Sequence, residues 1–181
     1  SIYDKTQRLR KLSGMLADEF NLNKEKAEIA ASISKSDLCS DLVNEYPDLQ
    51  GLMGKYFALS QGFEEDVSNA VSDHYLPLGN NSKTSKKPIS YIVAISDKID
   101  TLVGFFLINE KPTSSKDPFA LRRSAIGLLR TIIDNKLNLK LRNLISYNIK
   151  LLEEQGVTKT NENSENEILN FLKERLKNIL K

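Results

Sequence analysis

ISYIVAISDKIDTLVGFFLI, residues 89–108, is the most apolar segment of the chain and decides its fold. The opening YIVAI is rich in β-branched residues and is compatible with a strand. However, a run of about 20 residues is much longer than an ordinary strand, and no other segment shows the alternation expected of a pairing partner. We therefore predict that residues 89–108 form a buried helix.

Two carboxylates interrupt this apolar run. Asp97 and Asp100 are three residues apart and therefore share one face of the predicted helix. Because a buried carboxylate is costly unless it is paired or hydrogen-bonded, we expect both residues to have specific partners.

The next segment toward the C-terminus, DPFALRRSAIGLLRTII (117–133), predicts an amphipathic helix. Asp117 suits the N-cap and Pro118 the first turn. Arg123, Gly127 and Arg130 lie opposite the apolar stripe. A glycine between two arginines either exposes the backbone to another chain or a nucleic-acid backbone, or packs against a neighbouring helix, with Arg130 paired to Asp134.

Further along, residues 141–152 predict another helix, closed by Gly156. A polar connector follows, and Ser164 and Glu167 have the spacing of a capping box for a last helix that extends to about Ile179.

Toward the N-terminus the same periodicity predicts helices up to Phe20, over the small-residue stripe of Ala27, Ala30 and Ala31, and over residues 64–75. Pro47 divides residues 41–59 into two short helices. Residues 78–88 form a polar, basic loop that contains Lys83, Lys86 and Lys87. The sequence therefore predicts an all-α fold.

Composition excludes several classes of protein. The 181 residues are 40% hydrophobic and 28% charged, which is typical of globular proteins. One cysteine, Cys39, and one histidine, His74, form neither an internal disulfide nor a complete zinc site. No apolar run is long enough to span a membrane, and we expect a cytoplasmic protein.

Charge is distributed unevenly along the chain. Residues 18–73 contain 12 Asp or Glu and 4 Lys, whereas residues 111–142 contain 8 Lys or Arg and 2 Asp. A basic stretch can bind phosphates, and an acidic stretch repels them. The alternative is that both stretches are solvated helix faces, or that they attract each other within the fold.

The familiar catalytic motifs for nucleotide binding, nucleophilic catalysis and zinc proteolysis are missing from the sequence. His74, between Asp73 and Tyr75, is more typical of a packing or capping residue than of a catalytic base. Cys39, beside Leu38, is interpreted as a small buried apolar residue.

Several longer stretches resemble one known family. They are SKSDLCSDLVNEYPDLQGLMGKYFA (34–58), DHYLP (73–77), SDKIDTLVGFF (96–106) and PTSSKDPFALRRSAIGLLR (112–130). In their order and spacing they are similar to the beta subunit of the bacterial, two-subunit glycyl-tRNA synthetase, as is FLKERL (171–176). The resemblance covers most of residues 8–135 and implies an internal piece of a longer subunit.

This resemblance implies a helical domain related to the HD phosphohydrolases over residues 1–155, and in 156–181 a connector and first helix of an anticodon-binding-like domain. Asp37 falls where the Asp of the HD metal-binding pair would be, and Asp97, with Asp100 nearby, near the last metal-binding Asp. The histidine positions of that site are not filled. The resemblance therefore implies a degenerate, catalytically inactive site that holds no metal.

The resemblance further implies a synthetase of two alpha and two beta subunits. Glycine activation with ATP and Mg would belong to alpha, so that this segment needs no cofactor, and beta would engage tRNA-Gly rather than DNA. From charge and placement, the candidate phosphate contacts are Lys116, Arg122, Arg123, Arg130, Lys83, Lys86 and Lys87.

Two other functions are compatible with the residues. One is a divergent metal-dependent nucleotide phosphohydrolase that uses Asp37, Asp97 and Asp100. The other is an interaction scaffold whose basic helix meets an acidic protein.

The sequence also departs from the family in the loop that contains Ser114, where the family more often has Gly. A residue other than glycine restricts the backbone angles, which makes anion binding by the backbone of this loop less favourable.

Overall fold

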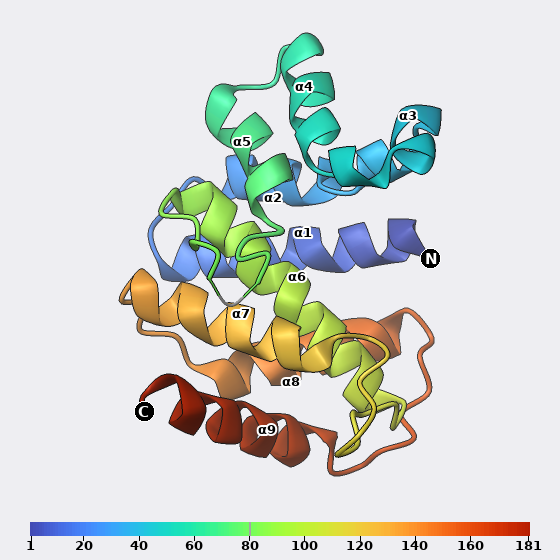
Figure 1. The fold of residues 1–181 in the computed structure, drawn as a ribbon, viewed down its shortest axis with the longest axis vertical. Coiled ribbons are helices and arrows are strands. Elements are labelled where there is room, and N and C mark those ends of the chain that lie inside the picture. Colours follow the sequence, from blue (N-terminus) through green and yellow to red (C-terminus); the bar gives the residue numbers. More distant parts are fainter. Residues whose placement is uncertain (80) are drawn as a thin grey trace.

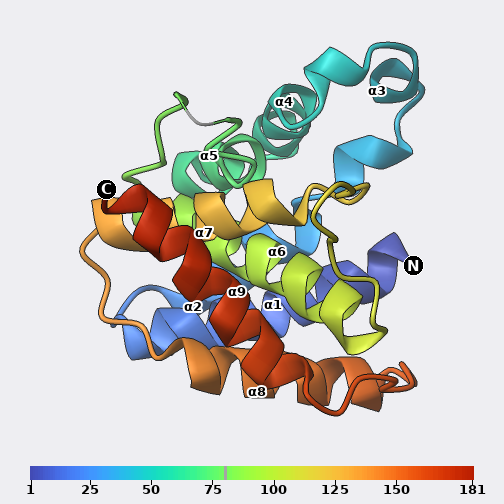
Figure 2. The same cartoon turned by 60° about the horizontal axis from the view of Figure 1, so that its bottom comes forward.

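The computed structural model describes residues 1–79 and 81–181, and its central element is the helix α6 (Pro88–Leu107). Residues 89–108 are thus helical, as predicted, and Pro88 occupies the first turn, where its missing N–H costs nothing. Ile92, Ile95 and Ile99 are fully buried. Figures 1 and 2 show α6 crossing the middle of the molecule, between α1 and α2 on one side and α7 on the other.

Six helices pack directly on α6. They are α1 (Ile2–Glu19), α2 (Lys24–Ile33), α5 (Glu65–Asp73), α7 (Leu121–Asp134), α8 (Leu141–Glu154) and α9 (Ser164–Ile179). The part of the chain that the structure describes contains no strand, so the all-α prediction is confirmed.

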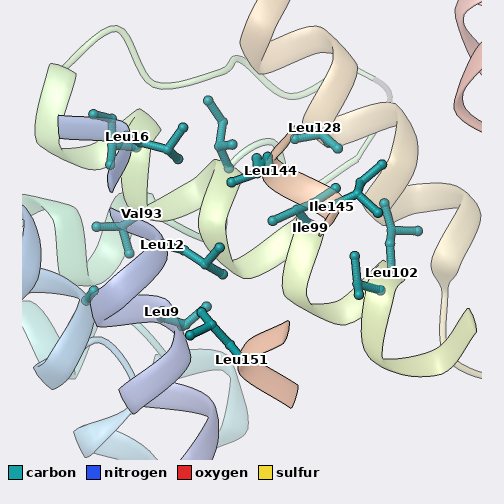
Figure 3. Close-up of a cluster of buried hydrophobic side chains, with 14 of the residues drawn as sticks. Leu9, Leu12, Leu16, Val93, Ile99, Leu102, Leu128, Leu144, Ile145 and Leu151 are labelled. Atoms are coloured by element: carbon teal, nitrogen blue, oxygen red, sulfur yellow. The ribbon is translucent and has the colours of Figure 1, made fainter. Parts of the chain in front are cut away.

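One hydrophobic core joins these helices. In Figure 3, leucines of α1 point toward Val93 and Ile99 of α6, while Leu128, Leu144 and Ile145 approach from α7 and α8. Ala27, Ala30 and Ala31 of α2 are fully buried, and the small side chains let α2 pack closely on α1.

Two predicted helix starts are wrong in detail. Helix α7 begins at Leu121 and not directly after Asp117, because Ala120 adopts a left-handed conformation with φ of 53°. The Asp117 carboxylate still accepts hydrogen bonds from the backbone N–H groups of Leu121 and Arg122, at 2.8 and 3.0 Å. It therefore satisfies the free N–H groups of the first turn from a short loop.

The predicted capping box at the start of α9 does not form. The N-cap position is Asn163, and the Ser164 hydroxyl is buried without a hydrogen-bond partner. The Glu167 carboxylate instead accepts hydrogen bonds from Lys111, at 2.9 Å, and from Asn161. Helix α9 is therefore held mainly by its packing on α6, α7 and α8.

A separate arm projects from the opposite end of the molecule to α8 and α9 (Figures 1 and 2). This arm consists of η1 (Ser36–Cys39), α3 (Asp41–Glu45), η2 (Pro47–Leu49) and α4 (Leu52–Ser60). Pro47 interrupts the helices, as predicted. Cys39 is exposed, so its interpretation as a buried residue is wrong.

The C-terminal segment shares the core of the preceding helices. Ile168 and Leu172 of α9 are buried in the same hydrophobic cluster as Leu102 of α6. A boundary at residue 155 between two domains stays a prediction. Within residues 1–79 and 81–181, no helix has both the length and the apolar character needed to cross a membrane.

Candidate functional site

The carboxylates of α6 lie in a buried ionic cluster. This cluster consists of Lys5, Arg8, Lys35, His74, Asp97 and Asp100, which come from α1, α6 and the ends of α2 and α5. The expectation that Asp97 and Asp100 have specific partners is confirmed. The cluster therefore ties α1 and the segments that follow α2 and α5 to the central helix.

Asp100 is the most completely buried carboxylate of the cluster, with a side chain 1% exposed. Arg8 donates to both of its oxygens, from Nε at 2.7 Å and from Nη2 at 2.9 Å. Asn148 of α8 donates to the same carboxylate at 3.1 Å, and Lys5 at 3.3 Å. A bidentate arginine and two further donors satisfy the charge that burial would otherwise leave unpaired.

Lys35 connects the histidine to the second carboxylate. Its ammonium nitrogen lies 2.8 Å from His74 Nε2, 3.0 Å from Asp97 Oδ2 and 4.1 Å from the centre of the Tyr75 ring. The Nδ1 of His74 lies 2.7 Å from the carbonyl oxygen of Val71. Because the ammonium can only donate, we assign the histidine proton to Nδ1, so that Nε2 accepts from Lys35.

Burial and neighbouring charge set the ionisation of this group. Burial, and then the positive charge of Lys35, lower the pKa of His74 to about 3. Burial also lowers the pKa of Lys35, against the attraction of Asp97. For Asp97, burial alone would raise the pKa, but the charges of Lys5 and Lys35 lower it well below its ordinary value. His74 is therefore neutral between charged neighbours.

The donor set does not fit a metal ion. Asp37 is buried and accepts a hydrogen bond from the backbone N–H of Gly51 at 2.6 Å. Between His74 and Asp97, the position that a cation would share is taken by the Lys35 ammonium. In residues 1–79 and 81–181, no three His, Cys, Asp or Glu side chains are grouped so as to hold a metal. Asp37 and Asp97 are thus each engaged by a group of the protein itself.

Gly127 of α7 packs inside the fold, which decides between the two interpretations of its position. A Cβ atom there would lie 2.8 Å from Lys98 Cε and 3.4 Å from Pro77 Cδ. Lys98 donates to the carbonyl oxygens of His74 and Leu76, at 3.1 and 2.8 Å, and burial lowers its pKa to about 8. The interpretation of an exposed backbone, open to a nucleic-acid strand, is wrong.

The loop before α6 lies along α7. Arg130 donates to the carbonyl oxygens of Gly79 and Ser82, at 3.1 and 2.7 Å. Thr84 donates to the Asp134 carboxylate at 2.7 Å, and Lys86 donates to the Asp134 carbonyl oxygen. These bonds place the basic residues of the loop beside those of α7.

The predicted phosphate contacts differ in how far they are already engaged. Lys83, Lys116 and Arg123 are exposed and make no ion pair within the described residues. Arg122 donates to the carbonyl oxygen of Thr113, and Lys87 lies 3.5 Å from the Asp73 carboxylate. We call the surface formed by the loop before α6, the loop before α7 and α7 itself the basic face; its cations are Lys83, Lys86, Lys87, Lys116, Arg122, Arg123 and Arg130.

The basic face and the ionic cluster meet at a small hollow. This hollow of about 230 Å³ is lined in part by Tyr75, Asp97, Lys98 and Arg123. Sequence reasoning found its carboxylate and its arginine but missed Lys98, and it also missed Lys5, Arg8 and Lys35 in the cluster. A lysine within the apolar run of α6 was the available signal for Lys98.

Taken together, the fold and site define an all-α protein with a buried ionic cluster and a basic face. Residues 1–181 match the family model described as "Glycyl-tRNA synthetase beta subunit". The chain belongs to this family.

Individual relatives give the same result. The glycine–tRNA ligase beta subunit of Colwellia psychrerythraea is 44% identical over 173 residues, 96% of this chain and 25% of the relative. The corresponding subunits of Rickettsia canadensis and a Janthinobacterium species are 40% and 37% identical, over 98% of this chain and 25% of each relative. The chain thus spans about a quarter of the length of these relatives.

Proposed function

We propose that the chain is a non-catalytic, tRNA-contacting module of a cytoplasmic glycine–tRNA ligase. In this proposal the beta subunit pairs with an alpha subunit, as two alpha and two beta, and alpha carries the ATP- and Mg-dependent activation of glycine. The module has an HD-like fold over residues 1–155, followed by the start of the next domain. Its role is to bind tRNA-Gly and to support the architecture of the subunit.

One observation carries the tRNA contact. Lys83, Lys116 and Arg123 of the basic face are exposed and lack acidic partners in the described part of the chain. Such cations attract phosphates at long range and release counterions when they bind them. The remaining cations of the basic face hold loop backbone or pair with Asp, so we assign them a positioning role.

The degenerate HD-like site fits the same proposal. Asp37 is used to hold the Gly51 N–H, and Asp97 is neutralised by Lys5 and Lys35. Carboxylates engaged in this way support the packing of the helices. We therefore assign the binding of a polyanion to the basic face.

The proposal is tested by titrating the chain into fluorescently labelled tRNA-Gly at several salt concentrations. We expect the double variant Lys83→Glu/Arg123→Glu to bind at least about tenfold more weakly, a loss of about 1.4 kcal/mol. We also expect the slope of log affinity against log salt to fall by about one for each phosphate contact removed.

A matched control separates the basic face from net charge. Lys11→Glu/Lys150→Glu makes the same change of charge on α1 and α8, where both lysines are exposed. This control is expected to keep most of the affinity and the salt slope. Equal losses in the two double variants, with unchanged circular dichroism, would contradict a localised contact and favour a purely architectural role.

A further inference from the structure

Helix α4 carries an apolar face that the described chain leaves about half exposed. Leu52, Tyr56 and Leu59 recur at i, i+4 and i+7 and therefore form one stripe. Their exposures are 46%, 54% and 39%. The opposite face of α4, with Gly54 and Ala58, is buried, and α4 packs on α5. A helix that is apolar on both faces is expected to be buried on both.

The same arm adds further exposed apolar groups. Leu42 of α3 is 38% exposed and Tyr46, at the end of α3, is 53% exposed. The Tyr46 and Tyr56 hydroxyls make no hydrogen bond within residues 1–79 and 81–181. Exposed tyrosine and leucine side chains gathered on one projecting element are typical of protein interfaces.

A hollow of about 480 Å³ lies at the start of the stripe. Pro47, Leu52, Leu76 and Leu78 contribute its apolar lining, and Leu78 is itself 67% exposed. Asp48 stands at the same hollow. The hollow can therefore receive an apolar side chain next to a basic one.

The charge of the arm indicates what kind of surface covers the stripe. Residues 36–66 contain seven Asp or Glu and a single Lys, which is Lys55 on α4 itself. Asp41, Glu45 and Asp48 are exposed and make no ion pair in the described part of the chain. These acidic groups of the arm, which we call the acidic rim, repel the phosphates of RNA and attract lysine and arginine.

We propose that the α4 stripe and its hollow are a docking site for a protein surface with an apolar centre and a rim of lysine and arginine. The apolar centre covers Leu52, Tyr56 and Leu59, and the basic rim pairs with Asp41, Glu45 and Asp48. The stripe lies on the arm, and its hollow borders the loop before α6 through Leu76 and Leu78. None of the cations of the basic face lines the hollow, so that a tRNA and a protein partner can be tested separately.

The first experiment replaces Tyr56 with the photo-cross-linking residue p-benzoylphenylalanine in the protein as it occurs in its own cells. We expect cross-links to a protein peptide that combines apolar residues with several Lys or Arg. The triple variant Asp41→Lys/Glu45→Lys/Asp48→Lys is expected to lower the yield at least about tenfold, because like charges would then meet across the rim.

The same photo-cross-linker at Tyr3 is the matched control, because Tyr3 is also an exposed tyrosine, at 70%. Cross-links from position 56 to RNA, to an acidic peptide, or at the yield of position 3 would overturn the proposal. So would the absence of any cross-link, or a yield unchanged by the charge reversal.

A second measurement uses the cross-linked peptide in synthetic form. The chain contains no tryptophan, so Tyr56→Trp places a single fluorescent reporter on the stripe. Titration with the peptide is expected to change its emission, and Leu52→Asp/Leu59→Asp in this background is expected to weaken binding at least about tenfold. Equal affinity in both proteins would overturn the site. Binding of tRNA by the basic face should be unaffected, so that the two proposals fail separately.

Discussion

Replacing Asp100 with alanine is expected to lower the free energy of unfolding by about 3–5 kcal/mol, because removing one partner of a buried ion pair leaves the other charge uncompensated. Asp100 accepts two hydrogen bonds from Arg8 and one each from Asn148 and Lys5. In the alanine variant, Arg8, Asn148 and Lys5 all lose the hydrogen bonds that they donate to this carboxylate. Urea unfolding followed by circular dichroism measures the difference.

The control for this prediction is Asp18→Ala. Asp18 also accepts a short hydrogen bond, from Lys24 at 2.7 Å, but its side chain is 60% exposed. An exposed pair of this kind contributes little to stability, because water screens the two charges. If the two alanine variants lose the same stability, burial of the ionic cluster does not determine its energetic role.

Acid is expected to destabilise the protein through His74. Its pKa is about 3 in the fold, against 6.5 for the free side chain. Below pH 6.5 the unfolded chain binds a proton that the folded chain does not, so stability falls as the pH falls. From pH 7 to pH 5 this single group accounts for a loss of about 2 kcal/mol.

Two groups near His74, Asp97 and Lys98, titrate in other pH ranges. The pKa of Asp97 is far below its ordinary value, so its contribution is lost only in stronger acid. Lys98 has a pKa of about 8 and titrates on the alkaline side. Neither Asp97 nor Lys98 therefore accounts for the slope between pH 7 and pH 5 that we assign to His74.

His74→Gln tests this assignment. The glutamine oxygen can still accept from Lys35, but the side chain does not titrate. Urea unfolding at pH 7, 6 and 5 should give a clear decline for the native chain and a nearly flat line for the variant. Parallel declines in both proteins would exclude His74 as the cause.

Much of the fold is predictable because its main signals are local. The length of the apolar run fixes α6 as a helix, and Pro47 fixes the division of the arm. No local signal predicts the start of α7. Ala120 is left-handed and separates Asp117 from the helix that Asp117 caps. Hydrophobic periodicity carries no information about such a loop.

The site is less predictable because its partners are distant in sequence. A buried carboxylate at Asp100 implies some cation, but nothing in the sequence selects Arg8, 92 residues earlier. Similarly, the environment of Gly127 depends on the aliphatic part of Lys98, which lies on another helix. Cys39 lies in the short 3-10 helix η1 and is exposed, which its apolar neighbour Leu38 does not predict.

The way Arg130 holds the loop before α6 has an evolutionary consequence. Its guanidinium donates to the main-chain carbonyl oxygens of Gly79 and Ser82. Every amino acid supplies the same carbonyl group, so mutations at these two loop positions leave the acceptors in place. Selection can therefore alter the charge and size of the loop side chains between species while the course of the loop along α7 is inherited unchanged.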